Sequence, residues 1–236
     1  MKIDYVILSS DLNPIYLDFW NPVKRLWSEH IGIKPVLIKI CDENSFTDNG
    51  DSIIISIKAI DGINTGFQSQ IARIFAYNYF ENKNCLISDI DMFPLSKNYF
   101  IDSVKDIDDT KIVIYSSDAY PLERRFPMCY VLGNSDVMKS VLDIDGDYEF
   151  FCRRLKLLNQ EWNTDEIYLT SKLRYLPNIV KLKRGWHNGV ASRRIDRVNW
   201  QYKDYLLTNG FYIDSHSIRP YSENKEIIDK LINQLI

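Results

Sequence analysis

Two aspartates, Asp89 and Asp91, stand two positions apart directly after the apolar residues 85–88. Side chains at positions i and i+2 of an extended segment point to the same side, so these two carboxylates would repel each other unless a cation lies beside them. A divalent metal ion with oxygen ligands removes this conflict, and such an ion also neutralises a diphosphate. The alternative is a turn in which one aspartate caps the backbone.

The segments around these aspartates favour the ligand role. Four short apolar runs are typical of buried strands: residues 3–10, 34–40, 52–58 and 84–88. Two segments carry apolar side chains at helical spacing, residues 15–32, interrupted by Pro22, and residues 66–83. Strand and helix therefore alternate, which predicts an α/β fold with a doubly wound sheet. Ligands of such sheets bind beyond the carboxyl ends of the strands, where the two aspartates stand.

The alternation becomes less regular after residue 100. Further strands are predicted at residues 111–117, 128–134 and 178–183, and further helices at 135–144 and 147–158. The polar residues 41–51 are predicted as a loop. Near the end, Ile227, Ile228, Leu231, Ile232 and Leu235 form one apolar stripe of a helix that is expected to pack on the sheet. No repeat or linker interrupts the sequence, so we expect a single domain.

The composition excludes several classes of protein. The chain has 236 residues, of which 45% are hydrophobic and 26% charged, with a net charge of -3, as in an ordinary folded protein without general affinity for nucleic acid or an anionic membrane. The sequence contains no run of about 18 apolar residues, so we expect no membrane span. The four cysteines are far apart, which argues against a zinc ribbon or a disulfide scaffold, and the apolar start is too short for a signal peptide. These features predict a cytoplasmic protein.

Polar residues in the second half could complete a site. Asp165 and Glu166 follow Thr164 and could bind a sugar, activate an acceptor or simply complement a helix dipole. His216 could ligate the same cation as the aspartates, or it could be an ordinary solvated histidine. Arg219, three residues on, could hold a phosphate oxygen or lie on the surface before a proline.

The first half and one basic segment supply further candidates. Arg73 and Gln70 lie on the predicted helix 66–83, where Arg73 could reach the ligand edge of the sheet or form a salt bridge with Asp89. Ser9, near the end of the first strand, could contact a bound nucleotide or belong to a plain turn between strand and helix. Residues 181–197 form a basic segment that could close over a diphosphate or be a solvated face: Lys183, Arg184, Arg193, Arg194 and Arg197, with Trp186 and His187 among them.

Residues 84–95, preceded by a helix with Arg73, resemble the D-x-D region of GT-A glycosyltransferases, which bind a nucleotide-sugar through Mn²⁺ or Mg²⁺. The likeness is to small glycosyltransferase domains of large DNA viruses and to the retaining glycogenin and galactosyltransferase-like group. Three later stretches are similar in the same order: 126–134, 163–170 with its acid pair, and 214–221 with its histidine, basic residue and proline. The resemblance spans most of the chain, and it is most specific for the D-x-D motif together with the histidine.

The resemblance implies a GT-A fold, with a mixed central sheet flanked by helices, and transfer of a sugar from a UDP-sugar to a glycan or other hydroxyl acceptor, with retention. Residues 1–100 would be the half that binds the nucleotide-sugar and residues 101–236 the acceptor side. It also implies roles for the candidates. Asp91 and His216 would ligate the metal, with Asp89 on the metal or the ribose. Ser9 and Arg73 would contact the donor, and Gln70, Lys183 and Arg219 are predicted from their own positions and charge to contact it as well. Asp165 and Glu166 would act beside the transferred sugar.

Two other functions fit parts of the sequence. A sugar-phosphate nucleotidyltransferase also combines a related sheet with acidic metal ligands, but it normally carries a glycine-rich basic loop after the first strand, which residues 9–18 lack. A non-catalytic carbohydrate- or nucleotide-binding module could keep the fold, but the presence of Asp89, Asp91, Asp165 and His216 together speaks against it. No nucleic acid is expected as a partner. The last helix could contact a membrane surface. If the chain is viral, the expected location is the cytoplasm of the host.

Overall fold

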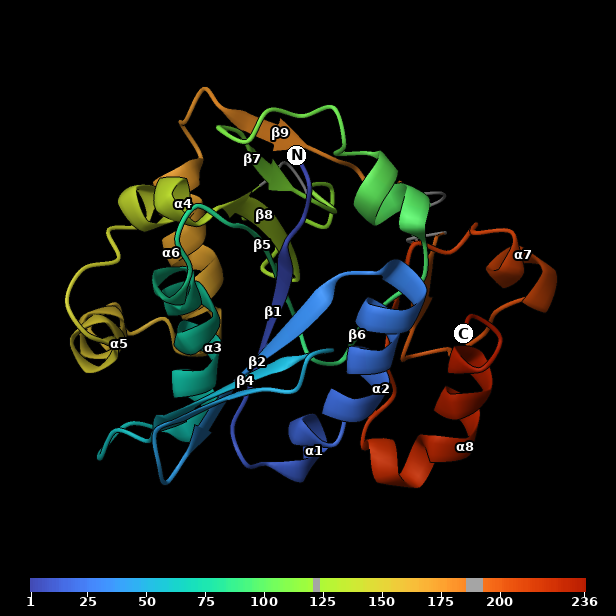
Figure 1. Cartoon of the computed structure of the whole chain (residues 1–236), viewed down its shortest axis with the longest axis horizontal. Coiled ribbons are helices and arrows are strands. Elements are labelled where there is room, and N and C mark those ends of the chain that lie inside the picture. The colour runs from blue at the N-terminus through green and yellow to red at the C-terminus, as the bar shows by residue number, and fades with distance from the viewer. Residues whose placement is uncertain (121–123, 186–192) are drawn as a thin grey trace.

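The candidate site residues lie at the carboxyl ends of central strands of the main sheet. The computed structural model describes residues 1–120, 124–185 and 193–236. Within them, eight strands form a sheet in the order β3-β4-β2-β1-β5-β8-β7-β9 (Figure 1). Their bounds are β1 (Tyr5–Ser10), β2 (Lys34–Cys41), β3 (Ser45–Asp48), β4 (Ile53–Lys58), β5 (Asn84–Ser88), β7 (Ile112–Ile114), β8 (Tyr130–Asn134) and β9 (Ile179–Lys181). Only β3 and β8 run against the others, so the sheet is mixed, as predicted.

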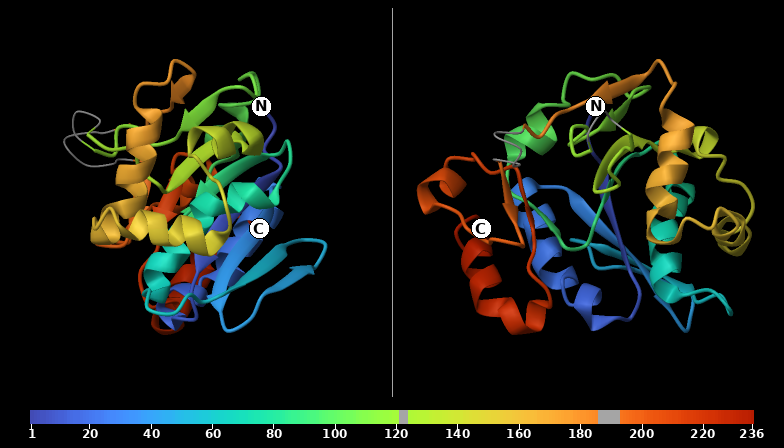
Figure 2. Two further views of the ribbon diagram at one scale, coloured as in Figure 1. Left: turned by 90° about the vertical axis from the view of Figure 1, so that its left-hand side faces the viewer. Right: turned by 180° about the vertical axis from the view of Figure 1, so that it is seen from behind.

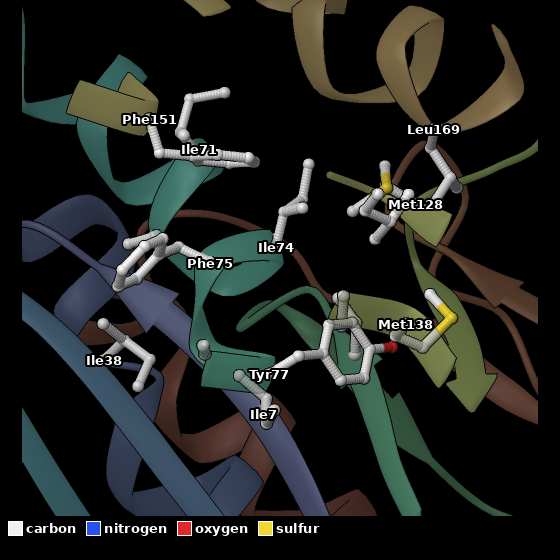
Figure 3. Close-up of a cluster of buried hydrophobic side chains, with 14 of the residues drawn as sticks. Ile7, Ile38, Ile71, Ile74, Phe75, Tyr77, Met128, Met138, Phe151 and Leu169 are labelled. Carbon is white, nitrogen blue, oxygen red and sulfur yellow. The ribbon is translucent and has the colours of Figure 1, made fainter. Parts of the chain in front are cut away.

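Successive side chains of the central strands pack alternately into two separate apolar cores, one on each face of the sheet. Ile7 of β1 faces one core, whereas its neighbours Val6 and Leu8 face the other, and all three are fully buried. The first core is covered by α3 (Thr65–Phe75), α4 (Ser135–Val141), α5 (Tyr148–Lys156) and α6 (Thr164–Leu173). Figure 3 shows Ile71, Ile74 and Phe75 of α3 within this core. Helices on both faces explain why the central strands are apolar throughout.

The second core lies on the opposite face of the sheet. It is covered by α1 (Pro14–Leu17), α2 (Trp20–Arg25), a π-helical segment (Leu26–Ile31), a second one (Asn98–Asp102), α7 (Asp204–Thr208) and α8 (Tyr221–Ile232). The two groups of helices are seen on either side of the sheet in Figures 1 and 2. Both ends of the chain pack on this face. Met1 and Ile3 are buried there, and so are Ile228, Leu231 and Ile232 of α8.

Several elements differ from the prediction. The predicted helix 15–32 is broken into α1, α2 and a π-helical segment, with Pro22 in the first turn of α2, where a missing N–H is tolerated. Residues 41–51 contain the edge strand β3, whose side chains are all exposed. An edge strand pairs on one side only and needs no apolar face, so the sequence carried no signal for it. Ile227, placed on the apolar stripe of the last helix, is 49% exposed.

A second, three-stranded sheet positions the loops of the site. It has the order β10 (Arg194–Asp196), β11 (Asp214–His216) and β6 (Met92–Pro94), and β6 begins directly after Asp91. The register pairs His216 with both Asp196 and Met92. This pairing brings the residues that follow β10 and β11 alongside the D-x-D segment.

The helices of the described residues include none that is both long and apolar enough to traverse a bilayer. The four cysteines are free and buried, at positions 41, 85, 129 and 152. Burial raises the pKa of the Cys129 thiol to about 12, which makes it a poor nucleophile.

Candidate active site

A cavity of about 450 Å³ opens at the carboxyl ends of β1 and β5. Its walls come from the end of β1, the first turns of α3, the D-x-D loop, the first turn of α6, and the loops that follow β10 and β11. Strands β1 and β5 are adjacent, but α1 and α2, which follow β1, pack on one face of the sheet, whereas α3, which precedes β5, packs on the other. A change of face between neighbouring strands is the position where α/β sheets open to ligands. Nine of the ten predicted site residues line this cavity, and Lys183 does not. The nine are Ser9, Gln70, Arg73, Asp89, Asp91, Asp165, Glu166, His216 and Arg219.

Arg73 joins the two acidic motifs of the sequence. Its Nη1 forms an ion pair with Asp89, and its Nη2 lies 2.6 Å from Oδ2 of Asp165. Burial by itself would lower the pKa of the guanidinium, but the two carboxylates outweigh it and raise the pKa well above its ordinary value. The predicted contact between Arg73 and Asp89 therefore exists, and a second carboxylate shares the same cation.

Asp165 is held in a nearly dry environment. It is 2% exposed, and burial raises its pKa in spite of the neighbouring Arg73. Its other oxygen, Oδ1, accepts the backbone N–H of Glu166 at 2.7 Å, at the start of α6. Asp165 thus supports the helix terminus with one oxygen and faces Arg73 with the other, so the two interpretations of this residue are compatible.

Glu166 is bound by two residues that sequence reasoning missed. The Tyr120 hydroxyl donates to both of its carboxylate oxygens, at 2.7 and 2.9 Å, and Arg125 lies 3.7 Å away. The Arg125 guanidinium also lies over the Tyr120 ring, 5.0 Å from its centroid. Burial and the nearby Asp165 raise the pKa of Glu166 above its usual range. Neither Tyr120 nor Arg125 stands in a motif or on a regular element, so no pattern pointed to them.

Asp91 also lines the cavity and is surrounded by three basic side chains. Its Oδ2 lies 2.9 Å from Nε of Arg219, 3.4 Å from Nη1 of Arg197 and 3.4 Å from Nε2 of His216. Burial alone would raise the pKa of this carboxyl, but His216 and Arg219 outweigh it and hold the pKa below its ordinary value. Burial likewise works against the charged form of His216, whose pKa is nevertheless raised by Asp91.

Part of the predicted metal site fits a divalent cation. Two ligands at right angles on an octahedral ion, each about 2.1 Å away, lie roughly 3.0 Å apart. The separation of 3.4 Å between Oδ2 of Asp91 and Nε2 of His216 is close to this value. Asp89, by contrast, faces Arg73, and the part of the chain that the structure describes contains no cluster of three His, Cys, Asp or Glu side chains suited to a metal. The protein thus offers two ligands, which leaves coordination positions for a bound diphosphate.

The remaining candidates occupy different places. Ser9 lies at the cavity, beside Asp11, which accepts the Thr65 hydroxyl at 2.7 Å and so ties the end of β1 to α3. Gln70 donates to the Trp162 carbonyl at 3.2 Å, and its own carbonyl oxygen has no hydrogen-bond partner among the residues that the structure describes. Lys183 is exposed outside the cavity. Trp186 and His187, part of the predicted closing segment, lie outside the described residues.

Solved structures with a similar overall fold are glycosyltransferases. The chain aligns over 99% of its length with GlyE of Streptococcus pneumoniae TIGR4 (TM-score 0.54, 12% identity) and spans 63% of that chain. It aligns over 98% with the galactosyltransferase LgtC, solved with donor and acceptor sugar analogues (0.53, 12% identity), and spans 96% of it. The chain has the GT-A glycosyltransferase fold. A third structure, a glycosyltransferase involved in the glycosylation of the major capsid of PBCV-1, aligns over 96% of this chain and 99% of its own (TM-score 0.53, 13% identity).

The likeness is one of structure. No protein-family model and no curated protein matches the sequence. The expected fold is confirmed by the GT-A neighbours, whereas identities of 12–13% leave the reaction to be argued from the site itself.

Proposed function

We propose that this GT-A protein is a metal-dependent glycosyltransferase that moves a monosaccharide from a nucleoside-diphosphate sugar, a UDP-sugar in the first instance, to a hydroxyl acceptor. The observation that carries the proposal is the division of one cavity into two walls. Asp91 with His216 and two arginines forms the first wall. The second wall is formed by Asp165, buried beside Arg73, and by Glu166, half-buried beside Tyr120. The first suits a diphosphate with its cation, and the second suits a sugar.

The first wall would hold the leaving group. Asp91 and His216 would bind Mn²⁺ or Mg²⁺, and Arg219 lies against the same carboxylate, where it can donate to a phosphate oxygen. A bound cation supplies Lewis-acid stabilisation of the charge that develops on the departing diphosphate. Ser9 at the end of β1 would lie near the nucleoside, and Asp89 would contact the ribose or the metal.

The second wall would hold the transferred sugar. Asp165 and Glu166 are carboxylates with raised pKa values, next to the partly unsatisfied Gln70. They can accept hydrogen bonds from sugar hydroxyls and stabilise positive charge at the anomeric carbon. Both carboxylates are already bound, Asp165 to Arg73 and Glu166 to Tyr120, so neither is free to act as a strong general base. This arrangement supports retention of configuration, with acceptor and leaving group on one face.

Binding of nucleoside diphosphates tests the proposal most directly. Titration calorimetry of the wild-type protein with UDP in the presence of Mn²⁺ should show one site, and chelation of the metal should weaken binding by about tenfold or more, because the ion neutralises the diphosphate. GDP, ADP, CDP and TDP serve as comparisons. If none of the five bound in a metal-dependent manner, the protein would not be a glycosyltransferase of this kind.

The configuration of the product tests the stereochemistry separately. A screen of UDP-sugars for slow hydrolysis identifies a donor, and proton NMR of the freshly released sugar then reports its anomeric configuration. We expect the configuration of the donor to be kept. An inverted product would assign Asp165 or Glu166 the role of general base instead.

A further inference from the structure

Asp91 faces more positive charge than it can balance. Its single carboxylate is in contact with the guanidinium groups of Arg197 and Arg219 and with His216. The opposite wall has the reverse excess, since Arg73 alone faces Asp89 and Asp165. A cavity with this division attracts an anion to the Asp91 wall.

The two arginines at Asp91 differ in how firmly they are held. Arg219 donates from Nη1 to the Tyr16 hydroxyl at 2.7 Å, and its guanidinium lies 4.8 Å from the centroid of the Tyr16 ring. The ion pair of Arg197 within the described residues is with Asp91 at 3.4 Å, and its side chain is 36% exposed. Arg219 is therefore fixed in one orientation, whereas Arg197 can turn towards a ligand at small cost.

The fold singles out Arg197 from the basic segment that contains it. Arg194 is buried in an ion pair with Asp214, and Arg193 donates to the Phe211 carbonyl outside the cavity. Arg197 directly follows β10, and the pairing of Asp196 with His216 places it beside the D-x-D loop and in the cavity wall. The register of the small sheet thus gives this arginine a position that sequence spacing could not predict.

We propose that Arg197 binds the second phosphate of the donor, the one bonded to the sugar, and makes the site selective for nucleoside diphosphates over monophosphates. The proposal rests on the proposed function. Arg219 is stacked on Tyr16 of α1, directly after β1, and so lies on the nucleoside side, nearest the first phosphate. Arg197 also belongs to the second half of the chain, but it reaches Asp91 from the end of β10 and not from the contact with Tyr16 that holds Arg219. With a cation at Asp91 and His216, the Arg197 guanidinium is free for two phosphate oxygens.

Calorimetry with matched nucleotides tests this assignment. The nucleoside diphosphate that the wild-type protein binds most tightly in Mn²⁺ is compared with its monophosphate in four proteins: wild type, R197Q, R197K and R193Q. We expect R197Q to bind the diphosphate about 10- to 100-fold more weakly, the range of a charge-assisted bidentate contact, with less than about threefold change for the monophosphate. R197K should recover part of the loss, and R193Q, whose arginine lies outside the cavity, should bind as wild type.

The outcomes separate this proposal from the function on which it rests. A wild-type protein that bound no nucleoside diphosphate would overturn both. Wild-type binding with an unchanged diphosphate affinity in R197Q would overturn the assignment of Arg197 alone, and so would equal losses for diphosphate and monophosphate. Thermal melting of each variant confirms that the protein is folded, so that a loss of affinity reports the site.

Discussion

Replacing Asp91 by asparagine should lower the rate of sugar transfer or donor hydrolysis by about 100-fold or more, a loss typical of removing one stabilising group at a developing charge. Asp91 is the only carboxylate in contact with His216, Arg197 and Arg219 within the described structure. The amide keeps the shape of the side chain but removes the charge that holds these groups and a cation together. Release of UDP from the active donor measures the effect.

Asp106→Asn is the matched control, because Asp106 is exposed on the surface, away from the cavity. It should release UDP at the wild-type rate. A D91N protein with wild-type turnover would show that the transfer does not take place at this wall. Weaker metal-dependent binding of UDP in D91N, measured by calorimetry, would place the defect at the diphosphate and not in the overall fold.

Replacing Arg73 by methionine should destabilise the protein by about 3–5 kcal/mol, the range found when one partner of a buried ion pair is removed. Asp165, 2% exposed, would lose the cation that compensates its charge and would have to stay charged in a buried place or take up a proton, and Asp89 would lose the same partner. For a chain of 236 residues this loss corresponds to a fall in melting temperature of roughly 6–20 °C. Differential scanning calorimetry gives the value.

The double variant R73M/D165N separates charge from packing. Neutralising Asp165 should restore part of the stability lost in R73M, because the uncompensated buried charge is gone. Arg153→Met is the control for removing an arginine: Arg153 is exposed on α5 and pairs with Glu149 one turn away, a contact worth only about 0.2–0.5 kcal/mol. Equal losses of stability in R73M and R153M would contradict the importance assigned to the buried pair.

The sequence predicted those parts of the fold that depend on local pattern. Strands β1, β2, β4 and β5 are buried on both faces, and so they appear as uninterrupted apolar runs. Helix α3 has its apolar side chains on one face, and the predicted contact of its Arg73 with Asp89 is present in the structure. Asp165 and His216 were expected at the site because their surroundings resemble a known motif.

The rest depends on contacts that spacing does not encode. Strands β6, β10 and β11 have three residues each, too few to show a period of two, and they are held by pairing with one another. Arg197 enters the cavity only through this pairing. Lys183, chosen from the same basic segment by charge alone, lies outside, because charge does not determine which side of a chain faces a site.

The contacts that define the cavity join distant parts of the chain: Arg73 and Asp165 are 92 positions apart, Asp91 and Arg197 are 106 apart, and Tyr16 and Arg219 are 203 apart. Loops of this length close late, because their closure entropy is recovered only when the surrounding structure has formed. During synthesis on the ribosome, therefore, the first hundred residues can form strands and helices before the contacts that define the cavity exist. A chain that stopped before its last twenty residues would lack Arg219 at the cavity and helix α8, whose Ile228 and Leu231 fill the second core.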